Sequence, residues 1–181
     1  GGILGGAGPC FYLLSDYLPR YGVMQFDVAD LDQLLADGVL TDVITHEMGH
    51  VLGFGTMWDQ GRSLISGAGT SASAYTGPLG VAGWSTLGGT GNVPLETGGG
   101  SGTADAHWSE SRFGIELMTG YKNSIMRLSA MSIAAIADLG YQVNLSAADP
   151  YVLPTTLRAA SEAAPQPFSN LQIPAPTPLG R

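Results

Sequence analysis

The sequence predicts an α+β fold in which a small β region, three helices and a long irregular segment share one core. Three observations support this class. β-forming and polar residues alternate loosely at 22–27. Apolar residues recur at helical spacing within 29–36, 40–54 and 125–139, and residues 61–102 are rich in Gly, Ser and Thr. With 181 residues and 44% hydrophobic content, the chain is long enough for one domain with a substantial core.

Before residue 22 the sequence predicts little regular structure. Residues 1–9, G-G-I-L-G-G-A-G-P, are too rich in glycine for a helix or strand, and residues 11–18 fit a short helix as well as a strand. The stretch 22–27 predicts a strand, and 29–36 predicts a short helix that ends at Gly38. Because a lone strand cannot satisfy its backbone donors and acceptors, we expect the N-terminal sheet to be incomplete and to need upstream sequence.

The helix predicted within 40–54 carries the pattern H-E-x-x-H. Residues four apart lie on one face of an α-helix, so His46 and His50 can bind the same metal ion. Glu47 lies one step round the helix and can reach a metal-bound water without being a ligand. Two histidines at this spacing also occur by chance, but the apolar flanks and the terminating Gly53 favour a buried metal-binding helix.

A third ligand has to come from elsewhere, because catalytic zinc usually takes three protein ligands and a water molecule. His107 is the only histidine outside the helix. The carboxylates Glu96, Glu110 and Glu116 are the alternatives. A histidine beside a tryptophan is more often ordinary packing, but the helix motif and the lack of another histidine favour His107 as the ligand.

The segment 61–102 is expected to be an ordered, irregular excursion, because apolar residues are scattered through it. Its glycine-rich clusters at 88–92 and 98–105 lack the lysine of a phosphate loop and the acidic spacing of an EF-hand, which favours structural turns. A structural Ca²⁺ ion is not predictable from them. A C-terminal helix is predicted at 125–139, and the prolines of 165–178 predict an extended tail or linker.

Composition excludes some classes of partner. The net charge is −8 with only seven Lys and Arg residues, which argues against binding to nucleic acid or to an anionic membrane surface. The uncharged run 63–95 contains Pro78 and Pro94 among many Gly, Ser and Thr residues, so it is not a membrane-spanning helix. Only 12% of residues are charged and 27 are glycine, a profile that suits a loop-rich secreted protein.

Several motifs together resemble the leishmanolysin family of metzincin zinc proteases. They are H-E-M-G-H-V-L-G-F-G at 46–55, H-W-S-E at 107–110 and E-L-M-T-G at 116–120. In most metzincins the third histidine closely follows the helix glycine, where this chain has Thr56. In the leishmanolysin branch a long insertion intervenes, as it does here between Gly53 and His107. The resemblance covers residues 3 to 145.

This resemblance implies a metzincin-like zinc protease fold with an active-site helix, a long irregular insertion, a Met-turn and a C-terminal helix. It also implies that Met118 is the Met-turn residue and forms a hydrophobic floor under the metal. Eukaryotic members are rich in disulfides, so the single cysteine, Cys10, suggests a bacterial-type member. The sequence that normally precedes the G-A-G-P region at 6–9 is missing from this chain.

The expected function is that of a zinc-dependent endopeptidase. One catalytic Zn²⁺ ion held by His46, His50 and His107 would activate a water molecule, with Glu47 as general base. The strand at 23–26 would be the sheet edge that pairs with an extended substrate. The alternatives are a zinc hydrolase with a glutamate as third ligand and a non-catalytic adhesion or binding module on a protease-like fold. The intact Glu47 argues against the latter.

The expected organisation has three parts. Residues 1–55 form part of an N-terminal subdomain with the edge strand and the active-site helix. Residues 56–148 form a C-terminal subdomain with the third zinc ligand, the Met-turn and a helix, and residues 149–181 form a Pro-rich tail or linker. We expect protein or peptide substrates and an extracellular or cell-surface location, whereas the oligomeric state cannot be predicted from the sequence.

Overall fold

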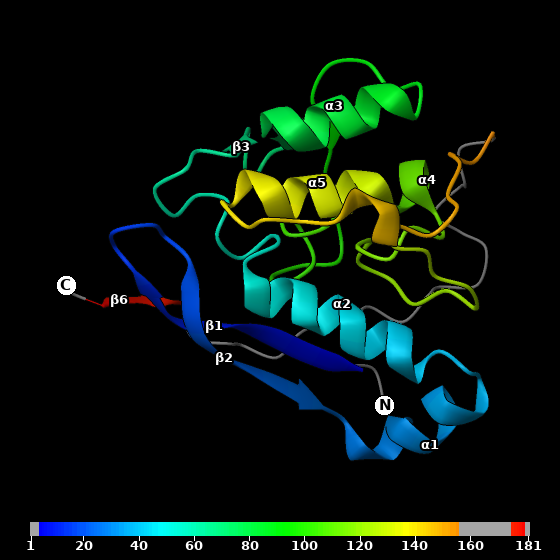
Figure 1. The fold of residues 1–181 in the computed structure, drawn as a ribbon. Coiled ribbons are helices and arrows are strands. Elements are labelled where there is room, and N and C mark those ends of the chain that lie inside the picture. Colours follow the sequence, from blue (N-terminus) through cyan, green and yellow to red (C-terminus); the bar gives the residue numbers. More distant parts are fainter. Residues whose placement is uncertain (1–3, 156–174, 180–181) are drawn as a thin grey trace.

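A computed structural model describes residues 4–155 and 175–179 of the chain and confirms the mixed α and β content (Figure 1). The elements, in chain order, are β1 (Gly5–Leu13), β2 (Pro19–Phe26), α1 (Val28–Ala36), α2 (Leu40–Leu52), β3 (Ile65–Ser66), β4 (Ala74–Tyr75), α3 (Pro78–Thr86), β5 (Val93–Pro94), α4 (Glu110–Phe113), α5 (Ala130–Asp138), the 3-10 turn η1 (Leu145–Ala147) and β6 (Thr177–Leu179). Helix α2 lies between the β1–β2 hairpin and α5 (Figure 1).

The first sheet has the strand order β2-β1-β6. β1 and β2 form an antiparallel hairpin in which Gly5 is opposite Phe26, and β6 is parallel to β1 with Thr177 opposite Phe11. The expectation of irregular structure up to residue 9 is therefore wrong, since β1 begins at Gly5. The expectation of a lone strand at 22–27 is also wrong, and with it the argument that this strand needs partners from upstream.

Close packing explains why glycine-rich sequence forms these strands. A Cβ atom at Gly5 would lie 3.0 Å from the Gln25 carbonyl oxygen and 3.3 Å from Glu47 Oε1. A Cβ atom at Gly22 would lie 2.8 Å from Val51 Cγ1 on α2. The glycines thus let α2 approach the hairpin, and this requirement of packing overrides the poor strand propensity of glycine.

The helices before and around the motif agree with the sequence pattern. The Asp27 side chain accepts a hydrogen bond from Ala29 N at 2.9 Å and so caps α1. Helix α2 ends at Gly53, whose φ of 112° is in the left-handed region. Helix α5 begins after Ser129, whose side chain accepts from Ser132 N at 3.2 Å, so it is shorter than the 125–139 expected.

Helix α3 lies inside the segment that was expected to be irregular. Its sequence, P-L-G-V-A-G-W-S-T, contains two glycines that weaken any helical pattern. These glycines allow close contact with α5, because a Cβ atom at Gly83 would lie 2.8 Å from Met131 Cα. The Asp138 carboxylate accepts hydrogen bonds from Leu79 N and Gly80 N and so stabilises the start of α3. The helix is therefore specified by its contact with α5 rather than by its own sequence.

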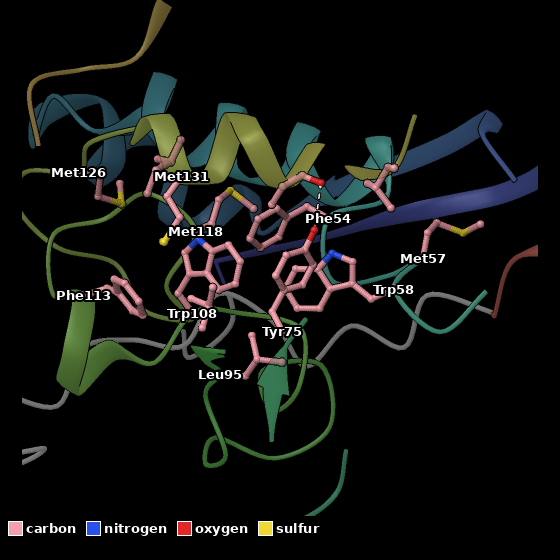
Figure 2. Close-up of a cluster of buried hydrophobic side chains, with 14 of the residues drawn as sticks. Phe54, Met57, Trp58, Tyr75, Leu95, Trp108, Phe113, Met118, Met126 and Met131 are labelled. Atoms are coloured by element: carbon pink, nitrogen blue, oxygen red, sulfur yellow. Dashed lines mark hydrogen bonds between the residues drawn. The ribbon is translucent and has the colours of Figure 1, made fainter. Parts of the chain in front are cut away.

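An aromatic cluster joins the end of α2 to the segment that precedes α5 (Figure 2). The ring of Phe54 lies 4.8 Å from that of Trp58 and 5.0 Å from that of Trp108, measured between centroids. Tyr75 contacts Trp58 at 4.8 Å and Trp108 at 5.4 Å. Except for the tilted Trp58–Tyr75 pair, these rings pack edge to face, which adds packing energy beyond area burial. The cluster thereby fixes Trp108, the neighbour of His107, against α2.

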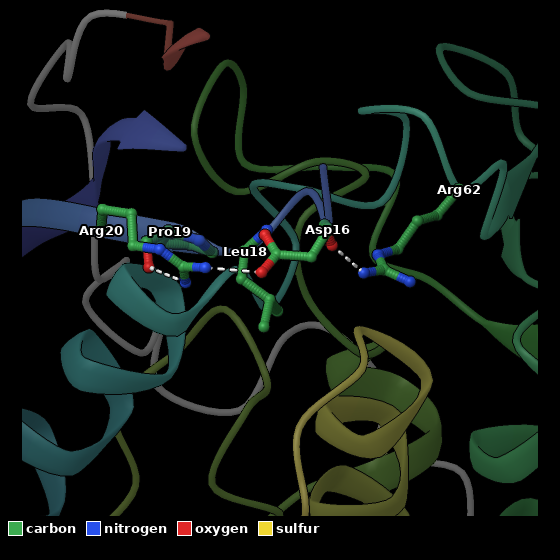
Figure 3. A network of polar contacts seen from close by, with 5 residues as sticks. All are labelled: Asp16, Leu18, Pro19, Arg20 and Arg62. Carbon is green, nitrogen blue, oxygen red and sulfur yellow. Dashed lines mark hydrogen bonds and ion pairs between the residues drawn. The ribbon is translucent and has the colours of Figure 1, made fainter. Parts of the chain in front are cut away.

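Two polar links connect residues before α2 with residues after it. The main-chain carbonyl of Asp16, in the hairpin turn, accepts from Arg62 Nη2 (Figure 3). The Asp16 carboxylate accepts from Leu18 N and Arg20 Nη2, and these bonds, the Leu18 bond first, lower its pKa. Near the start of α2, Lys122 Nζ lies 2.6 Å from Asp37 Oδ2. The hairpin and α1 are thus each tied to the later part of the chain.

Part of the predicted C-terminal tail, 156–174, lies outside the described residues, while β6 at its end pairs with β1. In the described ranges 4–155 and 175–179, no helix has the length and apolar character needed to cross a membrane.

Alanine substitutions at two glycines with left-handed φ angles distinguish the cost of backbone strain from the cost of steric overlap. Gly38 (φ 73°) has open space where a Cβ would lie, whereas at Gly55 (φ 70°) a Cβ would lie within 2.9 Å of three backbone atoms of Ala106. Gly38→Ala should lower the free energy of unfolding by about 1 kcal/mol, from backbone strain alone. Gly55→Ala should lower it by roughly 2–5 kcal/mol, because overlap is added to strain. Urea unfolding measures both, and equal losses would contradict the Gly55–Ala106 contact.

Candidate metal centre

Three histidine side chains converge at one point between α2 and the segment after β5. The Nε2 atom of His50 lies 2.9 Å from those of His46 and His107, and the last two are 3.2 Å apart. In tetrahedral zinc coordination, nitrogen ligands about 2.0–2.1 Å from the ion lie about 3.3 Å from one another. The triangle of Nε2 atoms is therefore close in size to one face of a zinc site.

Each ring is oriented by a backbone carbonyl on its other side. The Nδ1 atoms of His46, His50 and His107 lie 2.7, 2.9 and 2.9 Å from the carbonyl oxygens of Leu117, Phe54 and Thr103. A carbonyl only accepts hydrogen bonds, so each Nδ1 carries the proton and each Nε2 keeps its lone pair. Three lone pairs that face one another repel unless a cation lies between them. This donor set fits a metal ion.

Burial keeps the three rings neutral. Desolvation is the largest cause in each case and lowers the pKa of His50 to about 4 and that of His107 to about 3. The pKa of His46 is held well below its ordinary value by desolvation and then by the neighbouring His50 and His107. The neutral imidazole is the form that binds metal, so the rings are in their ligand state at neutral pH.

Glu47 lies beside this cluster on α2. Its side chain is buried, and neither carboxylate oxygen has a hydrogen-bond partner among the described residues. Desolvation raises the pKa of Glu47 to about 8, a shift that a nearby dication would oppose. A buried carboxylate that no protein group satisfies is costly. Such a group is expected where a water molecule or a substrate completes the site.

Met118 packs against α2 at Gly49. A Cβ atom at Gly49 would lie 2.8 Å from Met118 Cε and 3.1 Å from its Sδ, so the thioether fills the space at this glycine. The main-chain oxygen of Met118 accepts from Trp108 N at 3.0 Å. This pairing places the chain around Met118 beside the residue that follows His107.

The three candidate glutamates accept hydrogen bonds from groups outside the histidine cluster. Glu96 Oε1 accepts from Gly98 N, and Glu96 Oε2 accepts from Glu110 N. Glu110 Oε1 accepts from Asn123 Nδ2. The Glu116 carboxylate is directed at the start of α5. Among the described residues, the cluster that could hold a metal ion consists of His46, His50 and His107.

Strand β1 lies close to Glu47. The sequence predicted an edge strand at 23–26, and β2 does lie at an edge of the described sheet. On β1, a Cβ atom at Gly5 would lie 3.3 Å from Glu47 Oε1. This contact could not be predicted from the sequence, because no regular structure was expected for residues 1–9. Nor could the three carbonyl partners be predicted, since every residue type carries a carbonyl.

Comparisons with known proteins bear on this site. The family model described as Leishmanolysin matches residues 83–162, which include His107 and Met118. A leishmanolysin homolog from Crithidia fasciculata is 28% identical over 149 residues, which are 77% of this chain and 22% of that protein. The chain thus spans about a fifth of the length of the relative it matches. Both findings support a similarity of this chain to the leishmanolysin family, whose members are zinc-dependent.

The third ligand can be tested by metal content. His107→Ala should weaken zinc binding more than about 100-fold, beyond what loss of an outer-shell partner costs, because it removes one of three ligands. Glu96→Gln is the matched control and should keep wild-type affinity. Competition with a chromophoric chelator gives the affinities, and elemental analysis gives the stoichiometry. Tight, equimolar zinc in the His107 variant would exclude this ligand set.

Proposed function

We propose that this chain acts as a zinc-dependent endopeptidase of the leishmanolysin and metzincin type, hydrolysing peptide bonds in protein substrates. The observation that carries the proposal is the convergence of three neutral imidazoles beside Glu47, a buried carboxylate on the same helix. The similarity to the leishmanolysin family supports the same activity.

His46, His50 and His107 would hold the ion. When bound, Zn²⁺ supplies Lewis acidity that polarises the scissile carbonyl and lowers the pKa of a water molecule. The carbonyls of Leu117, Phe54 and Thr103 keep each ring in the tautomer that this requires.

Glu47 is the proposed general base and acid. Its carboxylate accepts a proton from the attacking water and then donates that proton to the leaving amine. Burial increases the proton affinity of this carboxylate, and its oxygens, which have no hydrogen-bond partner in the part of the chain that the structure describes, are available for the reacting groups. Met118 does not contact substrate in this scheme; it supports α2 between the two helix ligands.

The contact between Gly5 and Glu47 favours β1, rather than 23–26, as the strand that lines the substrate site. The low charge content and the single cysteine remain the basis for proposing a bacterial-type protein that is secreted or at the cell surface. A role in cell adhesion and the three-part division at residues 55 and 148 also remain proposals.

A glutamate as third ligand is less consistent with the geometry, because Glu96, Glu110 and Glu116 are engaged elsewhere. A non-catalytic binding module would gain nothing from a buried carboxylate such as that of Glu47, which has no hydrogen-bond partner among the described residues and is costly to bury. The first rival predicts zinc binding that survives the loss of His107. The second predicts no cleavage of casein.

Glu47→Gln should lower the rate of peptide cleavage by a factor on the order of 10² to 10⁴, because the amide cannot accept the proton from water. Zinc stoichiometry should be unchanged, since Glu47 is not a ligand. Asp32→Asn, on the exposed side of α1, is the control and should retain full activity. Initial rates on casein, with and without a zinc chelator, provide the measurement. Undiminished cleavage by the Glu47 variant would refute the mechanism.

A further inference from the structure

We propose that Glu116 is a positioning residue for the metal centre, which holds in place the chain segment that orients His46 and the tryptophan that follows His107. The inference rests on the proposed function, in that His46 and His107 are taken as metal ligands. Nothing in the chemistry of the reaction requires this carboxylate, and its sequence pattern suggested only an alternative ligand.

Glu116 is a fully buried carboxylate with four hydrogen bonds. Its Oε2 accepts from Met118 N at 2.6 Å. Its Oε1 accepts from Ser129 N at 3.1 Å, from Ser129 Oγ at 2.6 Å and from Ser132 Oγ at 2.5 Å. Glu116 therefore connects the segment 116–118 with the first turn of α5.

The donors in this network have fixed directions. Ser132 Oγ accepts from Trp108 Nε1 at 2.8 Å, so its own hydrogen is available for Glu116. Ser129 Oγ accepts from Ser132 N at 3.2 Å, so its hydrogen also goes to Glu116. All four bonds thus end on the carboxylate as acceptor, which is the arrangement that an ionised group satisfies best.

The network reaches two of the three ligands. The bond between Glu116 and Met118 N sets the path of the main chain at Leu117, whose carbonyl oxygen lies 2.7 Å from His46 Nδ1. The bonds from Trp108 through Ser132 fix the indole next to His107. If the Glu116 carboxylate moves, the partner of His46 and the neighbour of His107 move with it.

The cost of burying this charge indicates that its position is important. Burial raises the pKa of Glu116, and the bonds from Ser129, Ser132 and Met118 lower it. A buried ion of this kind is strongly destabilising unless other groups compensate its charge. The N-terminal end of α5 contributes further compensation, because a helix N-terminus favours an anion. Ser129 alone already caps α5, so capping does not account for the carboxylate.

Glu116→Gln tests the inference at one atom. The amide oxygen can still accept from Ser129 and Ser132, but the NH₂ group then faces Met118 N, which is also a donor. Asp138→Asn is the matched control. Asp138 also accepts from the start of a helix and from a hydroxyl, through Leu79 N at 3.0 Å, Gly80 N at 2.9 Å and Tyr75 Oη at 2.9 Å. None of these three bonds is made to Met118, Ser132 or Trp108.

Both variants should unfold at lower denaturant concentrations, but only Glu116→Gln should weaken zinc affinity, by about 10- to 100-fold. The visible absorption of the Co²⁺-substituted protein should change in the same variant, because the ligand geometry changes. Wild-type zinc affinity and an unchanged Co²⁺ spectrum in Glu116→Gln would overturn the proposal. Equal weakening by Asp138→Asn would also overturn it, because the effect would then follow stability alone.

Ser132→Ala decides the matter if Glu116→Gln does not fold. It removes the link to Trp108 and leaves the other three bonds to Glu116. Weaker zinc binding supports the proposal, and wild-type affinity overturns it. None of these measurements needs proteolysis. A wild-type chain that binds zinc but does not cleave casein would refute the endopeptidase while leaving the Glu116 comparison intact.

Discussion

The structure depends on one constraint: three imidazoles must direct their lone pairs at a single point while their protons remain on the far side. Helix α2 supplies two of the rings, since residues four apart share a face. The third ring and two of the three carbonyls that orient the set come from chain segments well beyond α2. The remaining architecture brings those segments back to the helix and holds them there.

Two kinds of packing accomplish this return. The aromatic cluster of Phe54, Trp58 and Trp108 joins the end of α2 to the segment that carries His107. Gly55 permits a contact with the Ala106 backbone that any larger residue would block, and Gly5 permits a close approach of the hairpin to α2 that a side chain would crowd. The first kind contributes burial energy and the second removes obstacles. Neither depends on the metal, so the protein part of the site is assembled by ordinary packing forces.

Some elements and site residues could be predicted from the sequence, because residue type and spacing alone indicate them, whereas others depend on tertiary contacts. The period of apolar residues located α1 and α2, and the count of histidines indicated His107. Strand β1 was missed because glycine has no strand propensity, although its small size is what α2 needs. Helix α3 was missed because its glycines serve contact with α5. As a glutamate, Glu116 was a candidate metal ligand. Its carboxylate instead accepts hydrogen bonds from Ser129 and Ser132, and these contacts depend on tertiary structure.

The contact between Gly49 and Met118 has a consequence for how this protein can vary. Gly49 has no left-handed φ angle, so a glycine is needed here for the space it leaves to Met118 and not for its backbone freedom. A glycine inside a helix costs about 1 kcal/mol relative to alanine. The thioether of Met118, from a distant part of the chain, occupies the volume where a side chain of residue 49 would lie. The two positions are therefore coupled, because a larger residue at 49 requires the end of the Met118 side chain to move or residue 118 to be shorter.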